Sequence, residues 1–334
     1  VTCTITNDDE APGLTLVKVV INDNGGDLGP DDFGLTVDGN PVTSGSTTPV
    51  DANTPVAINE AAVDGYDFVS ITGDAKCPAV LGGTVTLDPG ENVSCTITND
   101  DVAPTLTLSK VVENNFFGTS GPDDFGISVG GTVVSSGATL AYDANVALAI
   151  DETQVDGYEF VSITGDAECP QALGGTVTLD PGDVVNCTIT NRDIAPDINL
   201  AKAVNGPATL EMDGTYTVVY TITATNNSTG IGRYNIVDTF SPASGITFNS
   251  ATLAYQAGTE NDQSGTIAGS LNNGGQWVTD EDLGIGLSES WIVTANFSVD
   301  PATLDPAEAQ CDPSAPAINT GFYNAVSGVD QESN

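Results

Sequence analysis

The pentapeptide Cys-Thr-Ile-Thr-Asn occurs three times in this sequence, and the spacing of its copies is constant. The copies begin at Cys3, Cys95 and Cys187, which gives a period of 92 residues. Between them the two repeating units align without a gap, and roughly two-thirds of the aligned residues are identical. A fixed period of this length predicts an array of similar modules rather than one large core.

Each repeating unit has the pattern of a β-sandwich. Val93, Cys95, Ile97 and Asn99 fall on one face of the repeated segment and hydroxyl residues fall on the other, which is the alternation of a β-strand. The 37 glycines, 18 prolines and many short alternating runs indicate an all-β protein of two-sheet sandwiches. In the first unit we expect a loop at 43–48 and strands at 14–20, 33–37, 56–60, 66–71, 84–87 and 93–99.

The repeat register divides the chain into four parts. We expect 1–11 to be the terminal strand of a preceding module, 12–102 and 103–194 to be two similar β-sandwich repeats, and 195–334 to be a larger Ig-like sandwich. Short connections that contain proline predict a linear array of these modules. Since residues 1–11 repeat the end of a module without its body, we interpret the chain as an interior part of a longer head-to-tail array.

The chain is strongly acidic and lacks histidine. Its 46 aspartates and glutamates stand against 6 lysines and arginines, a formal charge of −40, so nucleic acids and anionic membrane surfaces are poor partners. Histidine is the commonest general base and metal ligand, so we do not expect an enzyme acting on an external substrate. No apolar run approaches the roughly 18 residues that a membrane span needs.

Acidic loops leave calcium as the one cofactor to consider. Residues 23–27, Asp-Asn-Gly-Gly-Asp, resemble half of a calcium-binding loop. The second repeat has Asn115, Phe116, Phe117 and Gly118 at the corresponding place. This difference favours a solvated turn over a calcium site, and we expect no other metal or cofactor.

The cysteines follow the same register. Cys77 and Cys95 are 18 residues apart, and Cys169 and Cys187 repeat that spacing. The register therefore suggests two disulfides, which form in oxidising, extracellular compartments. Zinc binding competes with this interpretation, but the chain has no Cys-x-x-Cys and no histidine to support it. Two cysteines remain without a partner in this register, Cys3 and Cys311.

Period-2 alternation places three polar side chains of each repeat on apolar faces. An amine and a carboxylate are almost never fully buried unless they are paired. Three accounts compete: the lysine reaches water at the sheet margin, lysine and glutamate form a buried ion pair with the asparagine as a hydrogen-bond partner, or the three residues react. They are Lys18, Glu60 and Asn99 in the first repeat and Lys110, Glu152 and Asn191 in the second.

The covalent account has a defined chemistry. Burial lowers the pKa of an amine and raises that of a carboxyl, so a neutral amine can meet a protonated acid. The amine then attacks the carboxamide carbon of asparagine while the glutamate polarises the carboxamide oxygen and relays protons, and ammonia leaves. The product is an isopeptide bond between the first and last strands.

Three short motifs carry a family resemblance. Leu-Thr-Leu-x-Lys, Glu-x4-Gly-Tyr (Glu60 with Gly65 and Tyr66) and Thr-Ile-Thr-Asn resemble the prealbumin-like B-type repeats of bacterial collagen adhesins and SpaA-like pilins, over residues 12–194. The resemblance implies that each first-strand lysine bonds to the last-strand asparagine, with the glutamate of Glu-x4-Gly-Tyr as catalyst. The cysteine pair is an addition that not all members of the family share.

Residues 195–334 depart from the repeat, with longer strands expected at 216–225, 234–240 and 291–299. Segments 199–202, 236–240 and 323–326 resemble the domain-of-unknown-function-eleven repeats of bacterial surface proteins. The region has its own polar residues on apolar faces, so a Lys–Asn bond with aspartate as catalyst competes there with a satisfied polar cluster. These residues are Lys202, Asp238 and Asn324.

Together these observations predict a structural segment of a bacterial surface fibre or adhesin stalk. Its partners would be neighbouring modules or subunits of the same fibre, joined head to tail at the extracellular cell surface. The alternative is an adhesive module that contacts a host, carbohydrate or neighbouring-cell surface through the C-terminal sandwich. A concave aromatic patch around Trp277 or Trp291 would favour that alternative.

Overall fold

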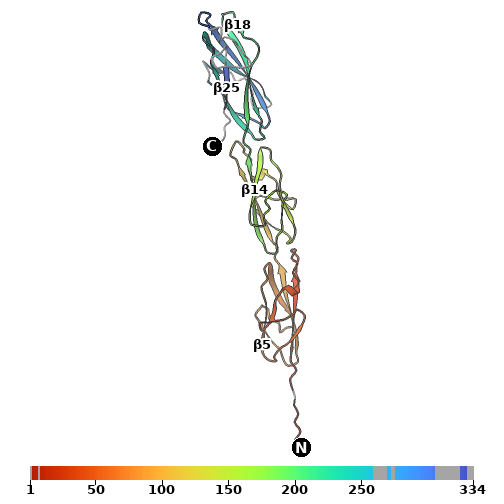
Figure 1. Ribbon diagram of the computed structural model, residues 1–334. Coiled ribbons are helices and arrows are strands. Elements are labelled where there is room, and N and C mark those ends of the chain that lie inside the picture. Colours follow the sequence, from red (N-terminus) through yellow and green to blue (C-terminus); the bar gives the residue numbers. More distant parts are fainter. Residues whose placement is uncertain (1, 7, 259–268, 272–274, 305–323, 329–334) are drawn as a thin grey trace. The chain divides into compact units, whose positions relative to one another are not determined.

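The computed structural model describes residues 2–6, 8–258, 269–271, 275–304 and 324–328 (Figure 1). Within these residues the regular structure is β-strand, apart from two short 3-10 turns, η1 (Pro30–Asp32) and η2 (Pro122–Asp124). None of the described residues forms a helix with the length and apolar character needed to cross a membrane. The protein is therefore all-β, as the alternation predicts.

The first repeat folds into two four-stranded sheets, with the strand orders β4-β1-β8-β6 and β3-β2-β5-β7. The segment 43–48, expected to be a loop, ends in a short strand that pairs with β1. The expectation was wrong there because this edge strand is largely exposed and shows no apolar alternation. The strands are β1 (Gly13–Ile21), β2 (Leu35–Val37), β3 (Asn40–Pro41), β4 (Thr47–Pro49), β5 (Pro55–Glu60), β6 (Tyr66–Gly73), β7 (Thr84–Thr86) and β8 (Asn92–Asp101).

The first and last strands of this repeat lie side by side and parallel. β1 pairs with β8 along its whole length, from Gly13 opposite Asn92 to Ile21 opposite Asp100. Alternate side chains of both strands enter the core, where Leu16 of β1 packs in the same buried cluster as Ile97 of β8. Parallel neighbours require a long crossover connection, and here the rest of the repeat provides it.

The second repeat has the same arrangement, with the sheet orders β12-β9-β16-β14 and β11-β10-β13-β15. Its first and last strands, β9 and β16, are again neighbours. The strands are β9 (Thr105–Glu113), β10 (Ile127–Val129), β11 (Thr132–Val133), β12 (Ala138–Ala141), β13 (Leu148–Glu152), β14 (Tyr158–Gly165), β15 (Thr176–Val177) and β16 (Val184–Asp193).

The C-terminal region is built from longer strands around its own core. One sheet has the order β17-β19-β24-β21-β22, with β18 on β19, and the other has the order β23-β20-β25. Trp291, Tyr234 and Phe297 are the largest of its fully buried side chains. The strands are β17 (Ile198–Val204), β18 (Thr209–Leu210), β19 (Tyr216–Asn226), β20 (Gly232–Phe240), β21 (Ile246–Gly258), β22 (Gly269–Leu271), β23 (Gly275–Leu283), β24 (Ser288–Val299) and β25 (Asn324–Ser327).

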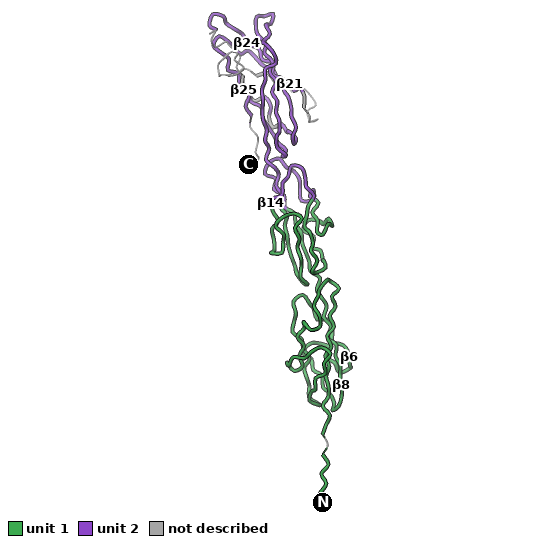
Figure 2. Tube along the Cα trace, turned by 45° about the vertical axis from the view of Figure 1, so that its right-hand side comes forward, with its two compact units in different colours: residues 1–110, 126–152, 162–189 green, residues 111–125, 153–161, 190–334 purple. Residues whose placement is uncertain are grey.

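The chain packs as two compact units whose boundary passes through the second repeat (Figure 2). One end of the second repeat therefore packs with the first repeat, and its other end packs with the C-terminal region. Unit 1 comprises residues 1–110, 126–152 and 162–189, and unit 2 comprises residues 111–125, 153–161 and 190–334.

Each repeat contains one disulfide, formed by the pair that the register predicts. Cys77 is joined to Cys95, with the Cα atoms 5.7 Å apart, and Cys169 is joined to Cys187, with the Cα atoms 5.8 Å apart. In the first repeat the bridge ties the connection between β6 and β7 to the last strand. It therefore braces the strand that pairs with β1.

The N-terminal segment lies outside these sheets. Residues 2–6 form no strand, Ile5 is 88% exposed, and Cys3 is a free, exposed thiol. That this segment completes a preceding module stays a prediction. Cys311, the other cysteine left over by the register, lies outside the described residues.

Removing a repeat's disulfide should destabilise that repeat measurably. For Cys77→Ala combined with Cys95→Ala we expect the free energy of unfolding to fall by about 3 kcal/mol, because an 18-residue loop is no longer closed in the unfolded chain. Denaturant unfolding of the variant beside the parent chain measures the loss. Peptide mapping without reduction should recover the two pairs, and a Cys77–Cys169 peptide would contradict the repeat register.

Candidate functional site

Three of the chain's four lysines are buried, and each lies beside one acidic side chain. The side chains of Lys18 and Lys110 are 0% exposed and that of Lys202 is 7% exposed, whereas Lys76 is 37% exposed. Lysine is almost never buried so completely without a partner, so these three positions define the candidate sites. The distances are Lys18 Nζ to Glu60 Oε2, 3.0 Å; Lys110 Nζ to Glu152 Oε2, 2.5 Å; and Lys202 Nζ to Asp238 Oδ1, 2.6 Å.

Three strands build the site of the first repeat. Lys18 lies on β1 opposite Ile97 of β8, and Asn99 lies two residues farther along β8, so the two side chains share the inner face of one sheet. Glu60 comes from the end of β5 in the other sheet. Lys18, Glu60 and Asn99 are 3%, 8% and 2% exposed. The fold thus brings residues from the beginning, middle and end of the repeat into one buried region.

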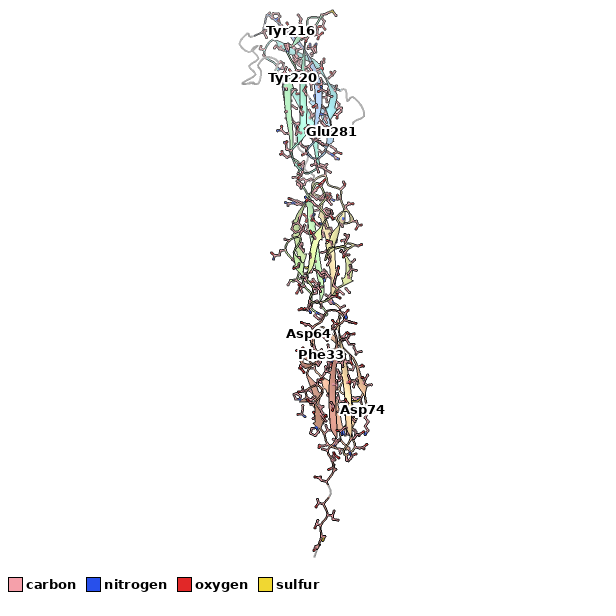
Figure 3. The ribbon with its side chains drawn as sticks, turned by 90° about the vertical axis from the view of Figure 1, so that its right-hand side faces the viewer. Phe33, Asp64, Asp74, Tyr216, Tyr220 and Glu281 are labelled. Carbon is pink, nitrogen blue, oxygen red and sulfur yellow. A yellow bond between two sulfur atoms is a disulfide. The ribbon has the colours of Figure 1, made fainter. Side chains whose placement is uncertain are left out.

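Polar atoms of this site lack hydrogen-bond partners. Among the described residues, Lys18 Nζ, Glu60 Oε2 and Asn99 Oδ1 are buried and take part in no hydrogen bond. The 3.0 Å approach of Lys18 to Glu60 is an ion-pair contact without hydrogen-bond geometry. Lys18 Nζ also lies 4.2 Å from the centroid of the Phe33 ring (Figure 3). Each unsatisfied buried polar group costs about 1–3 kcal/mol, so the cluster is costly in this state.

The second repeat places its three residues in the same way. Lys110 lies on β9, Asn191 on the neighbouring β16, and Glu152 at the end of β13. Lys110 and Asn191 are 4% and 3% exposed, and the side chain of Glu152 is 3% exposed. The account in which the lysine reaches water is therefore wrong. Each lysine stands within its strand rather than at the sheet margin, since β1 continues to Ile21.

Burial weakens the basicity of the three lysines. Loss of hydration lowers the pKa of Lys18 and of Lys110 below the usual value, against the opposing effect of the adjacent glutamate. Loss of hydration lowers the pKa of Lys202 to about 8. In the exposed Lys76, hydrogen bonds to Glu91 and Asp88 instead raise the pKa. The buried amines are thus better nucleophiles near neutral pH than an ordinary lysine.

The C-terminal region holds the third lysine in an aromatic environment. Lys202 of β17 donates hydrogen bonds to both carboxylate oxygens of Asp238 on β20, at 2.6 and 2.7 Å. Its Nζ lies 4.6 Å from the ring centroid of Tyr220, which is labelled in Figure 3, and 5.3 Å from that of Phe240. Asn324 begins β25, opposite Phe240, on a strand next to that of Asp238. The Asn324 side chain lies outside the described part, so its contact with Lys202 stays a prediction.

A second buried polar set, which the sequence reasoning missed, lies at one end of the first repeat. Asp101, 4% exposed, accepts hydrogen bonds from the backbone N–H groups of Asn24 and Gly26, at 3.1 and 2.7 Å, and from Asn24 Nδ2. The Tyr66 hydroxyl donates to Asn22 Oδ1 at 2.9 Å and accepts a hydrogen bond from another loop amide. These two residues anchor the loop 22–29 between β1 and η1.

The same anchors recur in the second repeat. Asp193 accepts hydrogen bonds from the backbone N–H groups of Asn115, Phe116 and Gly118, and the Tyr158 hydroxyl donates to Asn114 Oδ1 at 2.6 Å. They anchor the corresponding loop 114–121. The sequence did contain a signal for these anchors, because the tyrosine and the aspartate both recur after 92 residues. The tyrosine of Glu-x4-Gly-Tyr thus holds the loop that follows the first strand.

Acidic side chains gather beside the first of these loops. Carboxylate oxygens of Asp23, Asp100 and Asp101 lie within 4.8 Å of one another. Burial, and then the charges of the other two aspartates, raise the pKa of Asp100. In the second repeat Arg192 replaces Asp100. Carboxylate oxygens are ligands that calcium prefers, so calcium remains the alternative at this loop, and the expectation of a solvated turn rather than a calcium site stays a prediction.

Among the described residues the tryptophans form no aromatic patch of the kind that would favour an adhesive surface. Trp291 is 0% exposed in the core of the C-terminal region, where its indole N–H donates to the Tyr234 hydroxyl. Trp277 is partly buried against the same core. Within the described residues both are explained by packing.

Comparison with known families identifies the repeats. A family model described as a prealbumin-like fold domain matches residues 9–97 and again residues 101–189, which together are more than half of the chain. The chain belongs to this family. No curated protein matches it in sequence. The likeness of the C-terminal region to the domain-of-unknown-function-eleven repeats stays a prediction.

Two solved structures are similar at low identity. The full-length major pilin SpaD from Corynebacterium diphtheriae is 15% identical, over 57% of this chain and 56% of the pilin, with a TM-score of 0.16. A chain from a structure of a chaperone–tip adhesin complex in CFA/I fimbriae biogenesis is 9% identical, over 99% of both chains, with a TM-score of 0.22. The chain thus spans little more than half of the pilin's length. At these TM-scores neither likeness carries an argument.

The Asp101 anchor should give the first repeat a pH-dependent stability. Burial opposes ionisation of Asp101, but hydrogen bonds from Gly26 and Asn24 outweigh it and hold the pKa of this carboxyl below its usual value. A depressed carboxyl pKa stabilises the folded state above the unfolded pKa of about 4, and that stability is lost as the pH falls through the folded pKa.

We therefore expect Asp101→Ala to lower the free energy of unfolding by about 2–3 kcal/mol at pH 7, with the difference from the parent chain shrinking on acidification. Urea unfolding of both chains at a series of pH values measures this difference in the free energy of unfolding. The exposed Asp67 supplies the control, because Asp67→Ala should change little. A deficit that is constant down to pH 2 would contradict the anchoring role.

Proposed function

We propose that this chain is a structural segment of an extracellular bacterial surface fibre or adhesin stalk, in which each prealbumin-like repeat is closed by a Lys–Asn isopeptide bond. The observation that carries the proposal is the buried cluster of Lys18, Glu60 and Asn99 with its unpartnered polar atoms. The same three residue types recur as a buried set in the second repeat, where Lys110 donates a hydrogen bond to Glu152. This recurrence and the membership of the family support the proposal. The two disulfides support an oxidising, extracellular location.

The cross-linking step balances without an oxidant or cofactor. A proton passes from the Lys18 ammonium to the Glu60 carboxylate within their ion pair. The neutral amine then attacks the carboxamide carbon of Asn99, forming a C–N bond, and the Glu60 carboxyl donates a hydrogen bond to the carboxamide oxygen. Glu60 then relays the amine proton to the departing nitrogen, and ammonia leaves as the original C–N bond breaks. The lowered pKa of Lys18 supplies the neutral amine. The bond also removes the cost of the unsatisfied amine and carboxamide groups.

The proposed function of the bond is mechanical. Tension enters the repeat through β1 and leaves through β8, which are parallel neighbours. A covalent link from Lys18 to Asn99 carries that tension past the strands between them. On the chain-entropy model, a cross-link closing about 80 residues also contributes roughly 4.5 kcal/mol, against a total stability of about 5–15 kcal/mol for a domain of this size.

The C-terminal region extends the proposal to a different set of residues. Lys202 would bond to Asn324, with Asp238 in the role of the glutamate. The lowered pKa of Lys202 and its contact with Asp238 support this assignment. Tyr220 and Phe240 keep the amine in an apolar environment.

Intact mass of the denatured and reduced chain tests the proposal. Each bond removes one ammonia, so we expect the mass to fall short of the calculated value by about 17 Da for each bond formed. Fragmentation should yield branched peptides that join Lys18 to Asn99 and Lys110 to Asn191. A reduced chain with its full calculated mass would refute the cross-links.

Glutamate variants test the catalytic assignment. Glu60→Ala should leave the first bond unformed and the second intact, so the deficit falls by about 17 Da, and Glu152→Ala should do the reverse. Each repeat is thus the internal control for the other. Glu91→Ala, which alters the exposed Lys76 contact, should retain the parent mass deficit. Loss of both bonds in either single variant would point to general misfolding instead.

A further inference from the structure

The two anchored loops share a frame but differ at their tips. In loops 22–29 and 114–121 the anchoring tyrosine, aspartate and asparagine are the same, and both keep glycine at the fifth position, Gly26 and Gly118. The tip differs completely, being Asp-Asn-Gly at 23–25 and Asn-Phe-Phe at 115–117. A constant frame with a variable tip is the arrangement expected of a recognition loop.

The tip of the first loop contacts a turn of the second repeat within unit 1. The carbonyl of Asn24 accepts a hydrogen bond from the backbone N–H of Ala144 at 2.7 Å, and the carbonyl of Gly25 accepts one from Asn145 Nδ2 at 3.0 Å. Gly25 has a φ of +88°, and a Cβ placed on it would lie 2.5 Å from the Ala144 oxygen. This contact therefore has no room for a side chain at position 25.

The tip of the second loop makes a different contact within unit 2. Phe117, which corresponds to Gly25, presents its ring to Arg233, whose guanidinium carbon lies 4.9 Å from the ring centroid. Arg233 is on β20 of the C-terminal region, where its Nε also donates to Asp282. An arginine over a partly exposed aromatic ring such as that of Phe117 contributes on the order of 0.5–1 kcal/mol.

The connections beside the two tips share one backbone hydrogen bond, whereas the tips differ. The carbonyl of Gly65 accepts a hydrogen bond from Val102 N–H at 2.9 Å, and the carbonyl of Gly157 accepts one from Ile194 N–H at 2.9 Å. In unit 1 the connection continues with Gly182 N–H donating to the Val102 carbonyl at 2.7 Å. The same end of each repeat thus has the same backbone hydrogen bond next to its loop, between Gly65 and Val102 in the first repeat and between Gly157 and Ile194 in the second.

We propose that the loop tip is the element by which a prealbumin-like repeat docks onto the module that follows it, and that the sequence of the tip is matched to the kind of module it meets. An Asn-Gly tip accepts the Ala-Asn turn of another prealbumin-like repeat, because glycine allows the two backbones to approach. A Phe-Phe tip excludes that turn by its bulk and offers a ring to Arg233 of the larger sandwich. The inference needs only the tandem arrangement and is independent of the isopeptide bonds.

The first repeat has, at its other end, a turn like the one at Ala144 and Asn145 that contacts the first loop tip. Ala52 and Asn53 correspond to Ala144 and Asn145, and both asparagines have a φ of +60°. Gly90 N–H donates to the Glu10 carbonyl at 2.8 Å, as Gly182 does to Val102. By the same rule, the turn at 52–53 is a docking surface for the Asn-Gly tip of another prealbumin-like repeat.

Amide hydrogen exchange in the full chain tests the first contact. Asn145→Ala removes the side-chain hydrogen bond to Gly25, so exchange at the Ala144 amide should rise by about fivefold to tenfold. Asn53→Ala is the matched control, since it changes the same residue in the same turn conformation without such a contact to the first loop. An equal response of the Ala144 amide to both variants, or none to Asn145→Ala, would overturn the proposal.

Exchanging the tips tests this matching. Asn24→Phe with Gly25→Phe should deprotect the Ala144 amide while the Ile97 amide of β8 keeps its protection, which shows that the first repeat still folds. Phe117→Leu should shift the Arg233 Nε–H resonance, because the ring current is lost, and should leave Ala144 unchanged. The proposal would be refuted if the Ala144 amide stayed protected in the Phe-Phe variant, or if the Arg233 resonance did not shift in Phe117→Leu. If the Ile97 amide also lost protection, the first repeat would be unfolded, and the comparison of Asn145→Ala with Asn53→Ala would then test the proposal.

Discussion

The parallel pairing of the first and last strands is the constraint on which the rest of each repeat depends. In the first repeat it joins β1 to β8 over nine residues and forces the remaining strands into the crossover between them. It places Lys18 and Asn99 on one inner face. It also brings Asp101, at the end of β8, beside the loop that follows β1. The buried site and the anchored loop are therefore two consequences of one strand pairing.

Burial then gives ordinary polar residues unusual properties. The exposed Lys76 forms ion pairs with Asp88 and Glu91, which raise its pKa. Lys18 inside the sandwich loses hydration that a single carboxylate does not replace, so its pKa falls. The same low-polarity environment leaves Asn99 Oδ1 without a hydrogen bond. Such a core is either a stability cost or a reactive arrangement, and the recurrence of a buried lysine, glutamate and asparagine 92 residues later favours the second.

The strands and the disulfides followed from the sequence wherever one face of a strand is buried or the register repeats. Alternation placed β1, β5 and β8 and their inward residues, and the 18-residue spacing identified both cysteine pairs. The alternation pattern did not predict the strand Thr47–Pro49, because an exposed edge strand has no apolar face. Of the candidate sites, alternation placed Lys18 and Glu60 on apolar faces, but it left their ion pair as one of three competing accounts.

The sequence by itself determined the period, the all-β class and which polar side chains point inward, because these depend on local spacing along one strand. Only the tertiary structure decided that the lysines stay inside rather than reach water, since that depends on how far β1 continues past Lys18. Tertiary structure likewise revealed that Tyr66 and Asp101 anchor the loop 22–29, since their hydrogen-bond partners lie 44 and 77 residues away in the sequence. It also decided what the loop tips meet, because contacts between modules arise from packing that no single repeat encodes.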